Sequence, residues 1–177
     1  MNKRVFLLLA GSVLSMTLAW ADGEWDQARN AHERGDYAAE LAMIRPLAEK
    51  GYAFAQFNLG VLYDEGKGVP QDNAQAMAWY QKAAEQGLPQ AQVNLGIMYE
   101  QGQGMKPDYV QAYFWYALAD SQGDGQAPQA KKELAEKMTP AQIEEAERQA
   151  KDYQVKHPFR IPPTPAPTDS GAAHGNG

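Results

Sequence analysis

The sequence predicts an all-α protein in which pairs of antiparallel helices stack in a row as an α/α solenoid. The first observation is an internal repeat, because a shift of 36 residues superimposes Leu59 on Leu95 and Trp79 on Trp115. The second is that apolar residues within each copy recur at helical spacing and are bounded by glycines. Similarity at a period of about 20 to 50 residues is typical of stacked repeats, in which no single unit can bury its own apolar face.

Residues 1–21 have the pattern of an export signal. Residues 1–4 carry two positive charges, residues 5–18 are mostly apolar, and Ala19-Trp20-Ala21 supplies small residues at the positions that a signal peptidase reads. We expect cleavage after Ala21 and a periplasmic or secreted bacterial protein, with an uncleaved membrane anchor as the alternative. A lipoprotein anchor is excluded, because lipid is attached to a cysteine thiol and the chain contains no cysteine.

Residues 22–50 are predicted to form an N-terminal capping helix pair, which is a degenerate copy of the repeat. Asp36 corresponds to Asp108, two periods later. The first helix of this pair, near residues 25–34, lacks the Leu-Gly pair of the later copies. In its second helix, Met43 and Ile44 replace a tryptophan and a tyrosine. This loss of the repeat pattern suits the end of a solenoid, where one face meets water.

Two full copies of the repeat follow, in residues 51–86 and 87–122. In the first copy, one helix (helix A) ends at Gly66, and a second (helix B) begins after Asp72, whose carboxylate can cap free backbone N–H groups. The predicted buried stripes contain Ala55, Leu59, Leu62 and Tyr63 in helix A, and Ala76, Trp79, Tyr80 and Ala83 in helix B. The same pattern recurs in the second copy, so both repeat tryptophans are expected in the core.

Residues 123–156 are predicted to form a degenerate repeat and a C-terminal capping helix. Thr139 as N-cap, Pro140 at the first helical position and Gln142 three residues after the cap form a strong helix start. The apolar side of this helix, which we expect to cover the last repeat, contains Ile143, Ala146, Ala150 and Tyr153. Residues 157–177 are rich in proline and small polar residues, which predicts a disordered tail.

The two full copies share the pattern A-x-x-x-L-G-x-x-Y, then G-x-G, then D-x-x-x-A-x-x-W-Y-x-x-A. This pattern resembles the Sel-one-like (Sel1-like) repeat, a relative of the tetratricopeptide (TPR) repeat. The resemblance implies a right-handed superhelix of TPR-like helix pairs, with the A helices lining a concave groove where partner segments lie.

Composition and charge exclude several classes of partner and chemistry. The net charge is −6, or −8 once Lys3 and Arg4 are removed with the signal, so phosphate backbones and anionic lipid headgroups are repelled. The chain has no cysteine, and its serines outside the signal do not begin a Ser-x-x-Lys motif. His32, His157 and His174 do not have the spacing of metal ligands. We therefore expect no catalytic residue, no metal site, no cofactor and no nucleic-acid partner.

A second stripe on the A helices is the candidate partner-binding surface. Its residues recur at the repeat period and are offset from the buried stripe by helical spacing. The predicted partner-binding residues are Phe54, Phe57, Asn58, Val61, Gln90, Val93, Asn94 and Ile97. The apolar side chains would contact a partner segment and the two asparagines would pair with its backbone. The alternative is that the apolar residues only pack between neighbouring A helices.

These observations predict an exported, non-catalytic protein–protein interaction or scaffold module that binds a partner segment along the concave face. One alternative is an enzyme, because cysteine-rich relatives in the resembling family have been linked to penicillin binding and hydrolysis. The present chain lacks the cysteines of those relatives. The other alternative is a structural subunit of an envelope assembly that uses its convex face.

Overall fold

The computed structural model describes residues 23 and 25–158, so the predicted signal and all but the first two residues of the predicted tail lie outside the described residues. Every regular element of the described part is an α-helix, which confirms the all-α prediction. A first helix contains residues 25–33. The helices that follow are α2 (Tyr37–Glu49), α3 (Ala53–Glu65), α4 (Asn73–Glu85), α5 (Pro89–Gln101), α6 (Tyr109–Ser121), α7 (Ala127–Ala135) and α8 (Pro140–Lys156).

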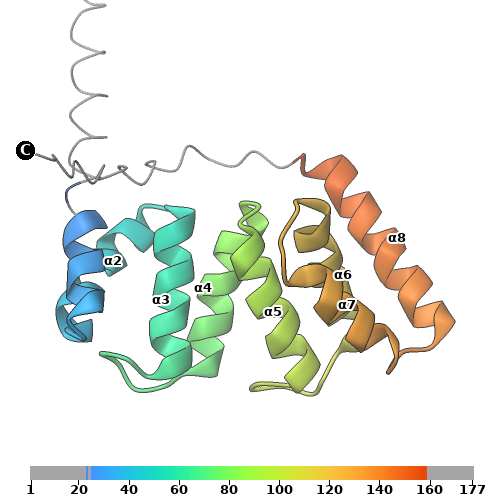
Figure 1. Ribbon diagram of the computed structural model, residues 1–177, viewed down its shortest axis with the longest axis horizontal. Coiled ribbons are helices and arrows are strands. Elements are labelled where there is room, and N and C mark those ends of the chain that lie inside the picture. Colours follow the sequence, from blue (N-terminus) through green and yellow to red (C-terminus); the bar gives the residue numbers. More distant parts are fainter. Residues whose placement is uncertain (1–22, 24, 159–177) are drawn as a thin grey trace, which may run out of the picture.

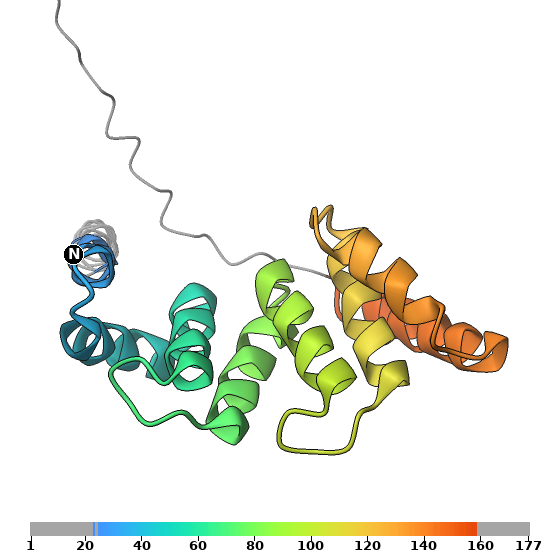
Figure 2. The same ribbon diagram turned by 60° about the horizontal axis from the view of Figure 1, so that its bottom comes forward.

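The helices stand in chain order along the long axis of the molecule (Figure 1), and the row follows an arc (Figure 2). The largest helix–helix interfaces join α3 to α4 and α5 to α6, which are the helix A and helix B of each full repeat. Contacts of α2 with α3 and of α4 with α5 connect successive pairs. The α/α solenoid predicted from the repeat is therefore confirmed.

Local sequence signals explain where the repeat helices begin and end. Oδ1 of Asp72 accepts a hydrogen bond from the backbone N–H of Gln75 at 3.0 Å, and Asp108 does the same for Gln111 at 3.0 Å. Each carboxylate thus satisfies one of the free N–H groups at a helix start. Helix α3 ends at Gly66, which adopts a φ of 67°, a left-handed conformation that glycine takes without steric cost.

The C-terminal helix begins and packs as predicted. Thr139 and Gln142 form a reciprocal capping box at the start of α8. Ala146 and Ala150 of α8 are buried, and both α7 and α8 pack on α6. α8 therefore covers the last full repeat directly, and shields the apolar face that a further repeat would otherwise bury.

The two repeat tryptophans differ in burial, which corrects the expectation that both lie in the core. Trp115 is buried, and its ring lies 4.9 Å from that of Phe114 and 6.3 Å from that of Tyr153 on α8. Trp79 is only half-buried, with the Lys82 ammonium 3.7 Å from its ring centroid. Trp115 gains its cover from α8, whereas a lysine lies over Trp79.

In the part of the chain that the structure describes, no helix is long and apolar enough to cross a bilayer.

Candidate functional site

The first half of the predicted binding stripe lies on α3. Phe54, Phe57 and Val61 are half-buried and pack against a core cluster that contains residues of α4 and α5. The Phe57 ring lies 5.7 Å from the ring of Tyr80 on α4. Asn58 is also half-buried. These apolar side chains therefore have both a packing role and an exposed part, which combines the two interpretations that the sequence left open.

The second half lies on α5 and includes one core residue. Gln90 is exposed, and Asn94 and Ile97 are half-buried. Val93 is only 4% exposed and belongs to a core cluster with residues of α6, α7 and α8. The assignment of Val93 to the binding surface is therefore corrected, because the neighbouring helices cover its side chain. The other seven residues remain candidates.

A tyrosine–carboxylate pair joins the two helices of the first full repeat. The Tyr80 hydroxyl donates a hydrogen bond to Oδ2 of Asp64 at 3.3 Å. Burial raises the pKa of Tyr80, and the Asp64 charge adds to the effect. Burial also raises the pKa of Asp64. The hydrogen bond from Tyr80 on α4 to Asp64 on α3 thus connects the two helices near the C-terminal end of α3.

The second repeat has a corresponding tyrosine–carboxylate pair. The Tyr116 hydroxyl donates to Glu100 at 3.0 Å, and the Lys137 ammonium donates to the same carboxylate at 2.8 Å. Burial raises the pKa of Tyr116, and the Glu100 charge adds to the effect. The acidic residue near the end of each A helix is therefore engaged in contacts within the solenoid.

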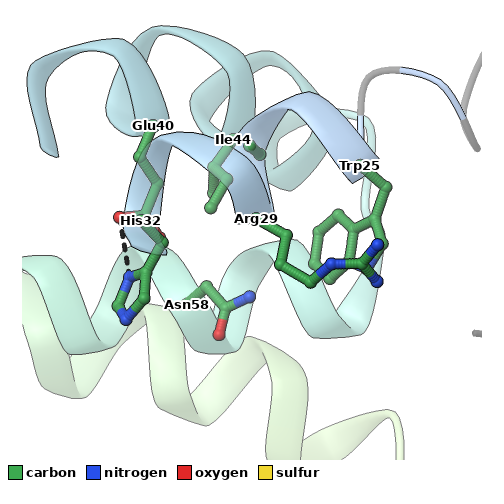
Figure 3. Close-up of a pocket in the computed structure, with 7 residues that line it drawn as sticks. Trp25, Arg29, His32, Glu40, Ile44 and Asn58 are labelled. Atoms are coloured by element: carbon green, nitrogen blue, oxygen red, sulfur yellow. Dashed lines mark hydrogen bonds and ion pairs between the residues drawn. The ribbon is translucent and has the colours of Figure 1, made fainter. Parts of the chain in front are cut away.

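Asn58 lines a pocket that sequence reasoning did not foresee. The pocket has a volume of about 230 Å³ and lies where the first helix meets α2 and α3. Figure 3 shows Trp25, Arg29 and His32 of the first helix around it, with Asn58 opposite them and Ile44 of α2 behind. The repeat pattern could not indicate this pocket, because the first helix lacks the repeat motif.

Buried glutamines form a second feature that the sequence analysis missed. Gln56 donates from Nε2 to the Ala48 carbonyl at 3.1 Å, and its Oε1 accepts from Gln86 at 2.6 Å. The contact repeats one period later, where Gln92 donates to the Ala84 carbonyl at 3.1 Å and accepts from Gln122 at 2.7 Å. The signal was present in the sequence, because Gln56 and Gln86 also recur after 36 residues.

The described histidines have partners other than a metal. His32 Nδ1 lies 2.9 Å from Oε2 of the buried Glu40, and the His157 ring stacks on Tyr153 with centroids 4.2 Å apart. Among residues 23 and 25–158, no group of three or more His, Asp or Glu side chains is arranged to hold a metal ion. His174 lies outside the described residues.

Comparison with known proteins identifies the repeat. Residues 53–88 and 89–124 each match the Sel1 repeat, and each match begins two residues after the copy boundary inferred from the sequence. A Sel1 repeat protein from Oxalobacter formigenes is similar in structure, with 33% sequence identity and a TM-score of 0.57, and the match covers 67% of this chain and 96% of that one.

A second solved structure is a protective antigen, c5321, present in uropathogenic Escherichia coli strains and displaying an SLR fold. It shares 34% sequence identity with a TM-score of 0.72, over 77% of this chain and 30% of the antigen. A stretch of 43 residues is 37% identical to DAP3-binding cell death enhancer 1 of Rattus norvegicus and of Mus musculus. The match spans 24% of this chain and 8% of the length of those two relatives.

Proposed function

We propose that this chain, which belongs to the Sel1 repeat family, is an exported scaffold module that binds a segment of a partner protein along its A helices. Sel1 repeat proteins generally mediate protein–protein interaction. They are generally non-catalytic scaffolds. The proposal adds the surface, the kind of partner and the cellular location to this family-level function.

The observation that carries the proposal is the repeated placement of amide side chains on α3 and α5. Asn58 and Asn94 hold the same position in successive repeats, and both remain partly exposed. Gln90 is exposed one turn before Asn94. An extended partner segment has unpaired backbone N–H and C=O groups, and an amide can both donate to and accept from such groups.

The apolar residues of the proposed surface add contact area. Phe54, Phe57, Val61 and Ile97 are half-buried, so each covers the core with one side and leaves another side accessible. A partner that covers the accessible sides would gain about 25 cal/mol for each Å² of apolar area removed from water. The proposed surface therefore consists of these four residues with Asn58, Asn94 and Gln90.

Export is part of the proposal and rests on residues 1–21. Two positive charges, a short apolar run and the Ala19-Trp20-Ala21 sequence support cleavage after Ala21 and a periplasmic or secreted location. The net charge of −6 favours protein partners over nucleic acid.

Site-specific photo-cross-linking tests the binding surface. A photoreactive amino acid replaces Gln90 on α5 in the native host, and the matched control replaces Gln81, an exposed glutamine on helix B of the preceding repeat. We expect a cross-linked partner from position 90 and none from position 81. Adding Asn58→Ala to the position 90 variant should lower the yield, because one amide contact is worth about 1 kcal/mol, or roughly fivefold in affinity.

The opposite result would support the structural-subunit alternative. Cross-links from position 81 alone mean that the B helices face the partner, and the groove proposal is then wrong. The circular dichroism spectrum and melting temperature of each variant must match those of the parent chain, so that loss of a cross-link reports on the surface and not on folding.

A further inference from the structure

We propose that the pocket between the first helix, α2 and α3 binds a carboxylate group of the partner segment. This inference rests on the proposed function, because Asn58 belongs both to the binding surface and to the pocket. It goes further by naming the chemical group that is recognised and by including residues outside the repeats. Trp25, Arg29 and His32 come from the first helix.

The size of the pocket suits one residue of a partner. Its volume is about 230 Å³, below the range of roughly 300 to 1,000 Å³ that is usual for drug-sized ligands. Ile44, which is buried, and the half-buried Trp25 provide apolar surface around it. A carboxylate carried on a short aliphatic stem would place the stem against these two side chains and the charge among the polar groups.

The accessible polar side chains that the first helix contributes to the pocket are those of Arg29 and His32, and both contain ring or guanidinium nitrogens. Arg29 has a side chain that is 49% exposed, and that of His32 is 48% exposed. The one acidic residue in the lining, Glu40, has a side chain that is only 5% exposed. Among the lining residues, a ligand therefore meets the Arg29 guanidinium before it can reach the Glu40 carboxylate, and this order favours an anion over a cation.

Glu40 acts on the pocket through His32. Oε2 of Glu40 lies 2.9 Å from Nδ1 of His32 (Figure 3), and when the Glu40 carboxylate is ionised it can only accept, which places the proton of this hydrogen bond on Nδ1. The other ring nitrogen, Nε2, is left on the side away from Glu40. In the imidazolium form of His32, Nε2–H can donate to a bound carboxylate while Glu40 balances the ring charge.

Arg29 retains donors for a ligand despite its contact with Asp26. One guanidinium nitrogen of Arg29 donates to Oδ1 of Asp26 at 2.8 Å, in an exposed pair on the same helix. A guanidinium has five N–H donors, and pairs of them match the two oxygens of a carboxylate. The Asn58 amide, on the opposite side of the pocket, can supply a further N–H group (Figure 3).

Small carboxylates test the pocket without the partner. The probes are N-acetyl-leucine, which carries a terminal carboxylate, and the α-amide of N-acetyl-glutamate, which carries a side-chain carboxylate. N-acetyl-leucinamide is the uncharged control. Nuclear magnetic resonance of the full chain follows the Trp25 indole N–H, assigned with Trp25→Phe. We expect both carboxylates to shift this signal at millimolar concentration and the control to leave it unchanged. The probe that binds with the lower Kd shows whether the pocket takes the C-terminal carboxylate of the partner or a side-chain carboxylate.

Matched variants link the binding to the proposed donors. Arg29→Gln should raise the Kd of the carboxylate probes about tenfold, whereas Arg34→Gln, an exposed arginine near the end of the same helix, should leave it unchanged. Asn58→Ala should also raise the Kd of the carboxylate probes. Asn94→Ala, at the corresponding position one repeat later, should leave that Kd unchanged.

Several outcomes would overturn the inference. Equal binding of N-acetyl-leucinamide would mean that the pocket recognises only apolar groups, and preferential binding of N-acetyl-lysinamide would mean that Glu40 selects a cation. No shift of the Trp25 signal, or an unchanged Kd in Arg29→Gln, would also contradict it. The cross-link from position 90 is independent of these probes. If that cross-link forms while the probes fail to bind, the pocket inference is wrong and the proposed function stands.

Discussion

Gly60 and Gly96 explain why a Leu-Gly pair recurs in the A helices. A Cβ atom on Gly60 would lie 2.6 Å from the Tyr80 ring, and one on Gly96 would lie 2.3 Å from the Tyr116 ring. Both distances are too short for carbon atoms in contact. The glycine in each repeat therefore provides the space into which the tyrosine of helix B packs, and the tyrosine hydroxyl then reaches the acidic residue near the end of helix A.

The different burial of the two repeat tryptophans predicts different effects on stability. Trp115→Ala should lower the free energy of unfolding by about 3 to 5 kcal/mol, as expected when a large core side chain is removed. Trp79→Ala should lower the free energy of unfolding by less than Trp115→Ala does, because the Trp79 ring is only half-buried. Its contact with Lys82 adds only about 0.5 to 1 kcal/mol.

Urea unfolding followed by circular dichroism measures both tryptophan variants. The control is Trp79→Phe, which keeps an aromatic ring against the core cluster of residues from the first helix, α2 and α3, and should lose less stability than Trp79→Ala. Equal losses for the two alanine variants would show that the position in the repeat, and not cover by α8, determines the contribution of the tryptophan.

At the scale of helices, buried glutamines connect one repeat to the next. Gln92 on α5 is fully buried, and it pairs with the Ala84 carbonyl near the end of α4 and with Gln122 after α6. The Ala84 carbonyl also accepts from the backbone N–H of Gly87 at 2.9 Å, so Gln92 supplies a second hydrogen bond at the end of α4 and links it to α5 of the next repeat.

Replacing Gln92 should therefore separate the role of the hydrogen bonds from that of side-chain volume. Gln92→Leu keeps a similar volume but leaves the Ala84 carbonyl and the Gln122 amide without this partner, so it should lower the free energy of unfolding by about 1 to 3 kcal/mol. Gln90→Leu, an exposed glutamine on the same helix, should change it by less than about 0.5 kcal/mol. Chemical denaturation of both variants checks this prediction, which a neutral Gln92→Leu would contradict.

At the scale of the whole molecule, the solenoid is closed at its C-terminal end by α8. Tyr113 of α6 donates to Glu147 of α8 at 3.0 Å, and Gln154 of α8 donates to Ser121 at 2.6 Å. Burial, with the nearby Glu147, raises the pKa of Tyr113 to about 12. α8 thus combines an apolar contact surface toward α6 with polar side chains toward water, as a terminal helix of a stacked array requires.

Export predicts a defined N-terminus for the mature protein. Edman sequencing or intact-mass analysis of the protein recovered from the periplasm or medium should identify Asp22 as the first residue, followed by Gly23, Glu24 and Trp25. Replacing Ala21 with a bulky residue should reduce processing, since the peptidase requires a small residue there. Recovery of the protein in the cytoplasm with Met1 intact would contradict the export proposal.

The sequence by itself determined the repeat period, the helices and most of their ends. These features depend on local chemistry: Asp72 and Thr139 cap the helices that follow them, and Gly66 takes the left-handed conformation that ends α3. The apolar side of α8 was also predictable, because Ala146 and Ala150 recur at helical spacing and are buried as expected.

Only the tertiary structure decided which residues of each stripe remain accessible. Val93 and Ile97 lie on the same helix and are both apolar, yet neighbouring helices bury the first and leave the second half-exposed. The pocket has the same origin, because Arg29 and Asn58 are brought together by the packing of separate helices. Helical periodicity is a property of one segment, whereas burial depends on which segments meet, and that is set by the packing of the whole solenoid.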